Sequence, residues 1–298
     1  MIIPNFLIIG AGKSGTSSLY YYLKQHPQIY MSSLKEPKFF AFEGDELDFK
    51  GPATESVKRF SVTTLEEYRK LFEDVTNELA VGEASPIYMY SPKAALKIKQ
   101  YIPKVKIIAI LRQPAERAFS AFSHLVREGY ETLSFEEALQ QEQKRIDNKW
   151  NPLFYYQDSG FYYSQLKMYF ELFEREQIKV YLYEDLRTDT SALLQNIFDF
   201  LNVERNFQPD LTKKNVSGIP KSRFVYDLFT KDNIVKTAFK PLFSNRVRRT
   251  IYDTITTKTL NPKPEMLLDT KLDLTRIYKQ DILQLQELID RDLSNWLF

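Results

Sequence analysis

Residues 5–18 carry the strongest structural signal in this sequence and read Asn5-Phe-Leu-Ile-Ile-Gly-Ala-Gly-Lys-Ser-Gly-Thr-Ser-Ser18. The apolar run 5–9 has the composition of a buried strand, and a helical pattern follows over residues 15–24. A turn between a strand and a helix gathers the backbone amides of the helix N-terminus at one point, where they stabilise an anion. The glycines let the backbone approach an oxyanion closely, and Lys13 adds a positive charge. This stretch predicts an α/β fold with a phosphate-binding loop.

The alternation of strand and helix continues through the first two thirds of the chain. Further strands are predicted at residues 29–31, 79–81, 105–111 and 178–183. The helices between them begin at recognisable caps, which are Thr64 with Glu67, Ser91-Pro92, Pro114, and Ser134 with Glu137. Two later stretches, 190–201 and 272–297, are also helical in pattern. We expect a central parallel sheet with helices on both faces, a three-layer α/β/α fold in which residues 1–298 form a single domain.

The composition of the chain excludes several kinds of chemistry. The 41 basic and 39 acidic side chains leave a net charge of +2, so no overall field attracts nucleic acid. The chain has no cysteine, which excludes disulfides, a thiol nucleophile and a thiolate metal centre; with two histidines and no acidic loop of cation-binding spacing, we expect no metal site. The N-terminus lacks a basic leader and a cleavage pattern, and no apolar run reaches about 18 residues. We therefore expect a cytoplasmic protein without a transmembrane segment.

Three kinds of phosphate loop compete for the glycine-rich stretch. The nucleotide-triphosphatase pattern G-x-x-x-x-G-K-[ST] needs a glycine at position 7, where this chain has Leu7. The dinucleotide pattern G-x-G-x-x-G fits Gly10, Gly12 and Gly15. That pattern also wants an acidic residue at the end of the second strand, where Ser32 and Ser33 stand and Glu36 is near the required offset. A flavin- or nicotinamide-dependent oxidoreductase therefore stays open as the alternative on these residues.

A second motif, Leu111-Arg-Gln-Pro-Ala-Glu-Arg-Ala-Phe-Ser120, follows the strand predicted at 105–111. Together with Lys13-Ser-Gly-Thr16 it resembles the sulfotransferases that use 3′-phosphoadenosine 5′-phosphosulfate (PAPS), bacterial members and heparan sulfate sulfotransferase catalytic domains above all. Five other segments extend the resemblance along the chain: Lys35–Phe40, Gly82–Tyr88, Gly160–Leu166, Asn215–Arg223 and Asp281–Leu297. The resemblance implies a P-loop, nucleotide-kinase-like fold. It also implies transfer of a sulfuryl group to a hydroxyl or amine of a carbohydrate-like or other small acceptor, release of adenosine 3′,5′-bisphosphate, and no metal.

The same resemblance implies roles for individual residues. The loop residues that it places on the 5′-phosphosulfate are Lys13, Ser14, Gly15, Thr16, Ser17 and Ser18, with Lys13 near the bridging oxygen. It places Arg112 and Ser120 on the 3′-phosphate; the alternative for Arg112 is an ion pair with Glu116. It also matches Lys221, Ser222 and Arg223 to the segment that closes over the nucleotide.

Glu36 matches the general base of the heparan-type enzymes, in a polar stretch, 32–61, that is too long for a plain connection. His124 is the other candidate base. Two departures from the family, Lys38 in place of histidine and Ala84 in place of lysine, leave the acceptor open among carbohydrates, lipids, phenols and amines. The basic segment 231–249 could hold an anionic acceptor or touch a membrane surface. The sequence gives no sign of an oligomeric state.

Overall fold

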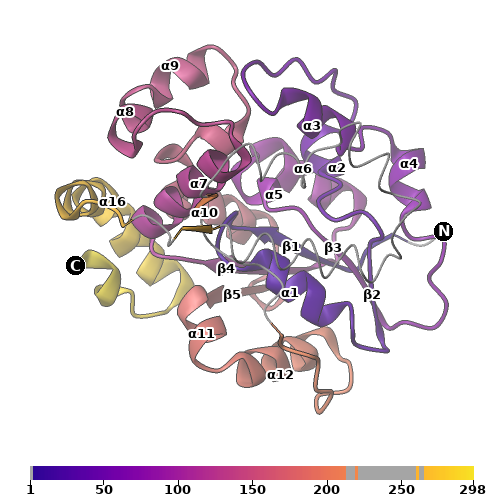
Figure 1. Cartoon of the computed structure of the whole chain (residues 1–298). Coiled ribbons are helices and arrows are strands. Elements are labelled where there is room, and N and C mark those ends of the chain that lie inside the picture. Colours follow the sequence, from indigo (N-terminus) through magenta and orange to yellow (C-terminus); the bar gives the residue numbers. More distant parts are fainter. Residues whose placement is uncertain (1–2, 213–218, 221–259, 262–264) are drawn as a thin grey trace.

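A five-stranded parallel sheet forms the centre of the computed structural model, which describes residues 3–212, 219–220, 260–261 and 265–298 (Figure 1). Its strands are β1 (Phe6–Gly10), β2 (Ile29–Met31), β3 (Ala80–Ala84), β4 (Lys106–Leu111) and β5 (Ile178–Leu182). They lie in the order β2-β3-β1-β4-β5, and every neighbouring pair is parallel. The strands that the sequence predicts are all present, with ends that differ by one to three residues. Tyr183, predicted to end the last strand, instead begins a helix.

The central strands are apolar along their whole length because both faces of the sheet are covered. Every residue of β1 is buried, and β4 is buried from Ile107 onward. Side chains of successive strand residues point to opposite faces. Phe6 and Ile8 accordingly pack into one core cluster, whereas Leu7 and Ile9 pack into the other. Two cores separated by one sheet make the three-layer α/β/α fold that the sequence predicts.

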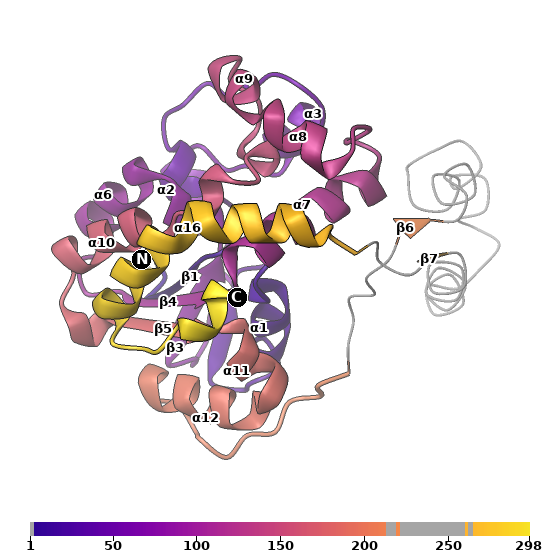
Figure 2. The same ribbon diagram turned by 90° about the vertical axis from the view of Figure 1, so that its left-hand side faces the viewer.

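Helices cover each face of the sheet (Figure 1). One face carries α1 (Thr16–Leu23), α11 (Tyr183–Thr188) and α12 (Thr190–Leu201). The other face carries α5 (Ile87–Tyr90), α6 (Pro92–Tyr101), α7 (Pro114–Glu128), α10 (Tyr162–Leu172) and α16 (Leu268–Ile289). Figure 2 shows α16 running across α7 and α10, so the C-terminal part of the chain packs on two helices that lie between β4 and β5 in the sequence.

Shorter elements complete the described chain. They are α2 (Phe39–Phe42), α3 (Thr54–Arg59), α4 (Leu65–Lys70), α8 (Phe135–Gln140), α9 (Glu142–Asp147), and the antiparallel pair β6 (Ile219–Pro220) and β7 (Leu260–Asn261). The stretch 32–61, predicted as a loop, contains α2 and α3. The helix predicted from Ser134 through Lys144 is two helices, interrupted at Gln141. In the described part of the chain, no helix is long and apolar enough to cross a membrane.

Candidate active site

The two predicted anion-binding motifs meet at one edge of the sheet. The glycine-rich loop follows β1, and Arg112 directly follows β4, the strand next to β1. The Ala11 amide donates to the Ile110 carbonyl at 2.8 Å, which fixes the loop against the end of β4. Neighbouring strands lie about 4.8 Å apart. The structure therefore brings the loop and Arg112 side by side.

The loop has a backbone that only some residues adopt easily. Gly15 has a φ of 103°, and a Cβ there would stand 2.6 Å from the Leu186 side chain of α11, so only glycine fits. Lys13 also lies in the left-handed region, with a φ of 71°. Ser14 and Thr16 are buried, whereas Ser17 and Ser18 at the start of α1 are partly exposed. These positions hold the loop close to the sheet, with the helix amides directed to the same edge.

Lys13 has charged neighbours from two other parts of the chain. The pKa of its ammonium is lowered to about 8, mainly by burial and then by the charges of Arg127 and Lys35, while Glu36 and Glu128 oppose that shift. These neighbours come from the stretch after β2 and from the C-terminal half of α7. Lys13 therefore lies where the glycine loop, the stretch after β2 and α7 converge.

Arg112 lies partly buried between an aromatic ring and a carboxylate. Its guanidinium is 4.8 Å from the centre of the Tyr183 ring, and its Nη2 is 2.7 Å from Glu116 Oε2. The ion pair with Glu116, foreseen as an alternative role, is thus present. The Tyr162 hydroxyl donates to the Arg112 carbonyl at 3.0 Å, so α10 supports this turn. Ser120 is one helical turn beyond Glu116 on the same face of α7 and is partly exposed.

The same face of α7 continues with His124, which the structure places beside cations. Its Nδ1 lies 2.8 Å from Arg127 Nη2. Because a guanidinium only donates, Nδ1 is the acceptor, and the imidazole proton is on Nε2. Burial, together with the positive charges of Lys13 and Arg127, lowers the pKa of His124 to about 3. His124 is therefore a neutral hydrogen-bond donor at physiological pH.

Glu36 stands in the irregular segment 32–38 between β2 and α2, called the Glu36 turn below. Its φ is 61°, its amide donates to the Ala84 carbonyl at 3.1 Å, and its carboxylate is 2.5 Å from Lys35 Nζ. Lys38, two residues on, also has a positive φ, 60°. The structure thus brings Glu36 together with Lys13 and His124, from three separate parts of the sequence.

Sequence reasoning missed a buried carboxylate beside this turn. Glu83 of β3 is fully buried and accepts hydrogen bonds from Tyr68, Ser85 and Tyr88. Its pKa is raised to about 7, mainly by burial and to a smaller extent by the charge of Glu36, while the three hydroxyl hydrogen bonds oppose the rise. A glutamate inside a strand of an otherwise covered sheet was the available signal. The predicted residues Lys221, Ser222 and Arg223 and the basic segment 231–249 lie outside the described residues.

Acidic side chains and the two histidines are the possible metal ligands of this chain. Among the described residues, no group of three or more histidine or acidic side chains could hold a metal ion.

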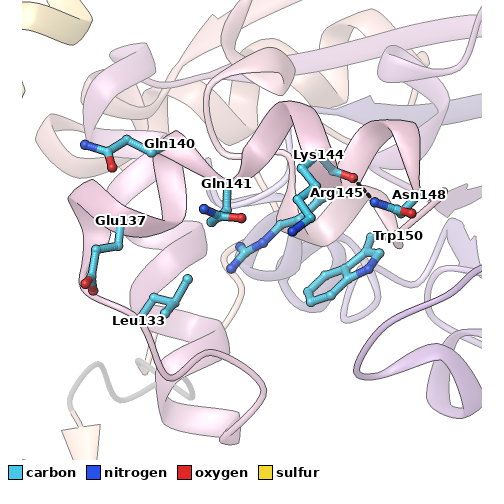
Figure 3. Close-up of a pocket in the computed structure, with 8 residues that line it drawn as sticks. All are labelled: Leu133, Glu137, Gln140, Gln141, Lys144, Arg145, Asn148 and Trp150. Carbon is cyan, nitrogen blue, oxygen red and sulfur yellow. Dashed lines mark hydrogen bonds between the residues drawn. The ribbon is translucent and has the colours of Figure 1, made fainter.

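A groove of about 500 Å³ is separate from the glycine loop and lies along α8 and α9 (Figure 3). It is lined by Leu133, Glu137, Gln140, Gln141, Lys144, Arg145, Asn148 and Trp150. The Trp150 ring is covered by the Arg145 guanidinium, 5.0 Å from its centre, and by the backbone of Gly51. The groove therefore presents amide and charged groups instead of an open aromatic face.

Comparison with known proteins identifies the group to which these features belong. A crystal structure of a sulfotransferase from Alicyclobacillus acidocaldarius is 35% identical in sequence, with 99% of each chain covered and a TM-score of 0.80. The Dictyostelium discoideum membrane-associated sulfotransferase kil1 is 24% identical over 72% of this chain and 59% of its own. The human bifunctional heparan sulfate N-deacetylase/N-sulfotransferase 3 is 27% identical over 72% of this chain and 24% of its own. This chain thus matches only part of each of these two larger relatives.

The profile of the sulfotransferase family matches residues 4–209, which include the glycine loop, Glu36, Arg112, Ser120 and His124. The match and the bacterial structure confirm the predicted resemblance and the predicted P-loop-like fold. They leave the oxidoreductase interpretation of the glycine pattern without support. The chain belongs to the sulfotransferase family.

Proposed function

We propose that this chain transfers the sulfuryl group of PAPS to a hydroxyl or amine of a carbohydrate-like or other small acceptor by in-line displacement. The observation that carries the proposal is the pair of cationic sites at the ends of β1 and β4, with Lys13 on one and Arg112 on the other. Membership in the sulfotransferase family supports the reaction class. The donor, the acceptor, the cytoplasmic location and the single-domain organisation are predictions.

Lys13 and the loop amides would act on the leaving group. Sulfuryl transfer builds negative charge on the bridging oxygen of the departing phosphate, so a fixed ammonium there stabilises the transition state more than the ground state. The partly buried position of Lys13 strengthens this effect because its charge is less screened there than in open solvent. The residues Ser14, Gly15, Thr16, Ser17 and Ser18 would supply amides and hydroxyls to the same anion.

Arg112 and Ser120 would bind the 3′-phosphate. The ring of Tyr183 and the carboxylate of Glu116 hold the guanidinium of Arg112 in one orientation, which reduces the entropy lost on binding. A guanidinium has five N–H donors, so it can keep Glu116 and still offer an edge to a phosphate. Lys221, Ser222 and Arg223 stay predicted nucleotide contacts.

Glu36 is the general base in this proposal, and His124 is a hydrogen-bond donor. An imidazole with a pKa near 3, whose Nδ1 already accepts from Arg127, is a poor base at neutral pH. Its Nε2–H can instead donate to a sulfuryl oxygen. Glu36 offers a carboxylate beside Lys13 at the same edge. It would take the proton as the acceptor attacks sulfur.

The proposal is tested first by ligand-induced stabilisation. Adenosine 3′,5′-bisphosphate should raise the melting temperature more than adenosine 5′-monophosphate does, since a ligand at about 100 times its Kd adds about 2.7 kcal/mol to apparent stability. Arg112→Ala should make the two shifts equal, while Arg276→Ala, on the exposed face of α16, should leave the difference intact. Equal shifts in the unmodified protein would contradict a 3′-phosphate site. Transfer of labelled sulfate from PAPS to an acceptor panel then tests the reaction.

A further inference from the structure

The buried carboxylate of Glu83 is linked to the turn that carries Glu36. Tyr88 donates to Glu83 Oε1 at 2.6 Å, and Ser85 donates to Glu83 Oε2 at 2.8 Å. Tyr68 of α4 also donates to Oε1, at 3.2 Å. An ionised carboxylate only accepts hydrogen bonds, so all three hydroxyl protons point at Glu83.

The hydroxyl oxygens of Ser85 and Tyr88 also accept hydrogen bonds. Once their protons point at Glu83, their lone pairs are free to accept. Ser85 Oγ accepts the amide of Lys38 at 3.0 Å, and Tyr88 Oη accepts the amide of Phe40 at 3.4 Å, the longer of the two bonds. With the bond from the Glu36 amide to the Ala84 carbonyl, residues 84–88 hold two alternate amides of the Glu36 turn and the Phe40 amide at the start of α2.

This turn needs such support because of its backbone. Glu36 and Lys38 both have φ near +60°, a region that costs a residue other than glycine about 1 kcal/mol or more. Strained positions persist only where surrounding contacts determine them. The Tyr68 hydroxyl donates to the same carboxylate. In contrast to the bonds of Ser85 and Tyr88, this bond does not connect Glu83 to an amide of the Glu36 turn.

We propose that Glu83 is a positioning residue for Glu36, because its carboxylate orients the hydroxyls of Ser85 and Tyr88 to hold the turn that presents Glu36 to the acceptor. The inference rests on the proposed role of Glu36 as the base. Glu83 itself is fully buried and does not touch the substrate in this arrangement.

The groups that face Glu83 set its charge. Tyr68, Tyr88 and Tyr169 from α4, α5 and α10 are fully buried, and burial raises their pKa values, so they stay neutral. Lys38 favours the ionised carboxylate, and Glu36 disfavours it. The resulting pKa of Glu83, about 7, implies that protonation near neutrality removes an acceptor that one hydroxyl uses. Activity should therefore fall as the pH drops through about 7.

The kinetic test compares hydroxyl deletions around one carboxylate. Ser85→Ala and Tyr88→Phe should lower kcat by about tenfold or more, since misplacing a catalytic group by 1 Å can cost about 100-fold. The matched control Tyr68→Phe removes a hydroxyl from the same carboxylate and should keep kcat within about twofold. All three should bind adenosine 3′,5′-bisphosphate like the unmodified protein. An equal loss in Tyr68→Phe, or full activity in Ser85→Ala, would overturn the proposal.

Two further measurements separate positioning from folding and from catalysis. Glu83→Gln should move the acidic limb of the kcat/KM profile from about pH 7 to lower pH, which a purely structural role would not do. Hydrogen exchange at the Lys38 amide should be faster in Ser85→Ala and unchanged in Tyr68→Phe. Unchanged exchange in Ser85→Ala would refute the inference even without an activity assay. Absence of sulfate transfer by the unmodified protein, with normal exchange behaviour, would instead contradict the proposed function.

Discussion

At the scale of single residues, the same positive charges, those of Arg127 and Lys35, lower the pKa values of Lys13 and His124. Both are partly buried near Arg127 and Lys35, and the protonated form of each raises the free-energy cost of protonating the other. The weaker base, His124, is neutral, whereas Lys13 keeps its proton up to about pH 8. A bound phosphosulfate would lower the free-energy cost of keeping Lys13 protonated. The site therefore repels further cations and favours a multiply charged anion.

The lowered pKa of Lys13 predicts an alkaline limb in the donor kinetics. Since the charged form exists below about pH 8, kcat/KM for PAPS should fall by up to about tenfold per pH unit above that value. Lys13→Arg should abolish this limb, because a guanidinium keeps its proton. Lys13→Ala should lose about 100-fold or more in kcat at pH 7. If the alkaline limb keeps the same pKa in Lys13→Arg, the limb reports a group other than Lys13.

At the scale of elements, the loop after β1 lies against α11 at Gly15, the residue that precedes α1. The missing side chain of Gly15 leaves room for Leu186 and Tyr183, the residue that also stacks on Arg112. A shift of α11 would therefore disturb the phosphosulfate loop and the Arg112 site together. The two proposed anion sites are linked through one short helix as well as through the sheet.

Replacing glycines of the loop tests this packing. Gly15→Ala puts a Cβ 2.6 Å from Leu186 at a positive φ, so we expect a loss of about 1–3 kcal/mol in the free energy of unfolding. Gly12→Ala is the matched control, because its Cβ would meet Pro86 only at 3.8 Å; it should cost less than about 1 kcal/mol. Urea unfolding measures both. Similar losses would show that the contact with α11 does not limit the loop.

Local signals and tertiary contacts explain which elements could be predicted. Thr64 caps α4 and Ser134 caps α8, as expected, because a cap is encoded within four residues. The break at Gln141 was missed because the buried carboxylate of Glu142 accepts the amides of residues 157 and 158, which no local pattern reveals. In the candidate site, motifs gave the loop and Arg112. The network around Glu83 was missed because Tyr68, and the Lys38 amide that Ser85 accepts, lie far from these residues in the sequence.

At the scale of the whole molecule, the C-terminal residue Trp296 packs on residues that support the Arg112 site. Trp296 lies at the end of the chain, yet it is only 1% exposed. Its carbonyl accepts from Gln113 Nε2 at 3.3 Å, and its indole donates to Glu184 at 3.1 Å. Its ring also packs edge-on against Tyr162, which holds the Arg112 carbonyl. Trp296 thus contacts Gln113 at the start of α7, Tyr162 of α10 and Glu184 of α11, although it lies beyond residues 4–209 that the family profile matches.

Removing the Trp296 side chain should therefore destabilise the whole protein and not only its terminus. Trp296→Ala should lower the free energy of unfolding by about 3–5 kcal/mol, as for other buried tryptophans, and should weaken binding of adenosine 3′,5′-bisphosphate because the Arg112 turn loses its support. Phe298→Ala, at a position that is 80% exposed, should change stability by less than about 0.5 kcal/mol. If residues 3–212 and 265–298 form a single domain, urea unfolding of both variants is one transition with an unchanged m value, because all of the core is lost together. A separate early transition in Trp296→Ala, with ligand binding retained, would show that α16 and the C-terminal turn fold as an independent unit.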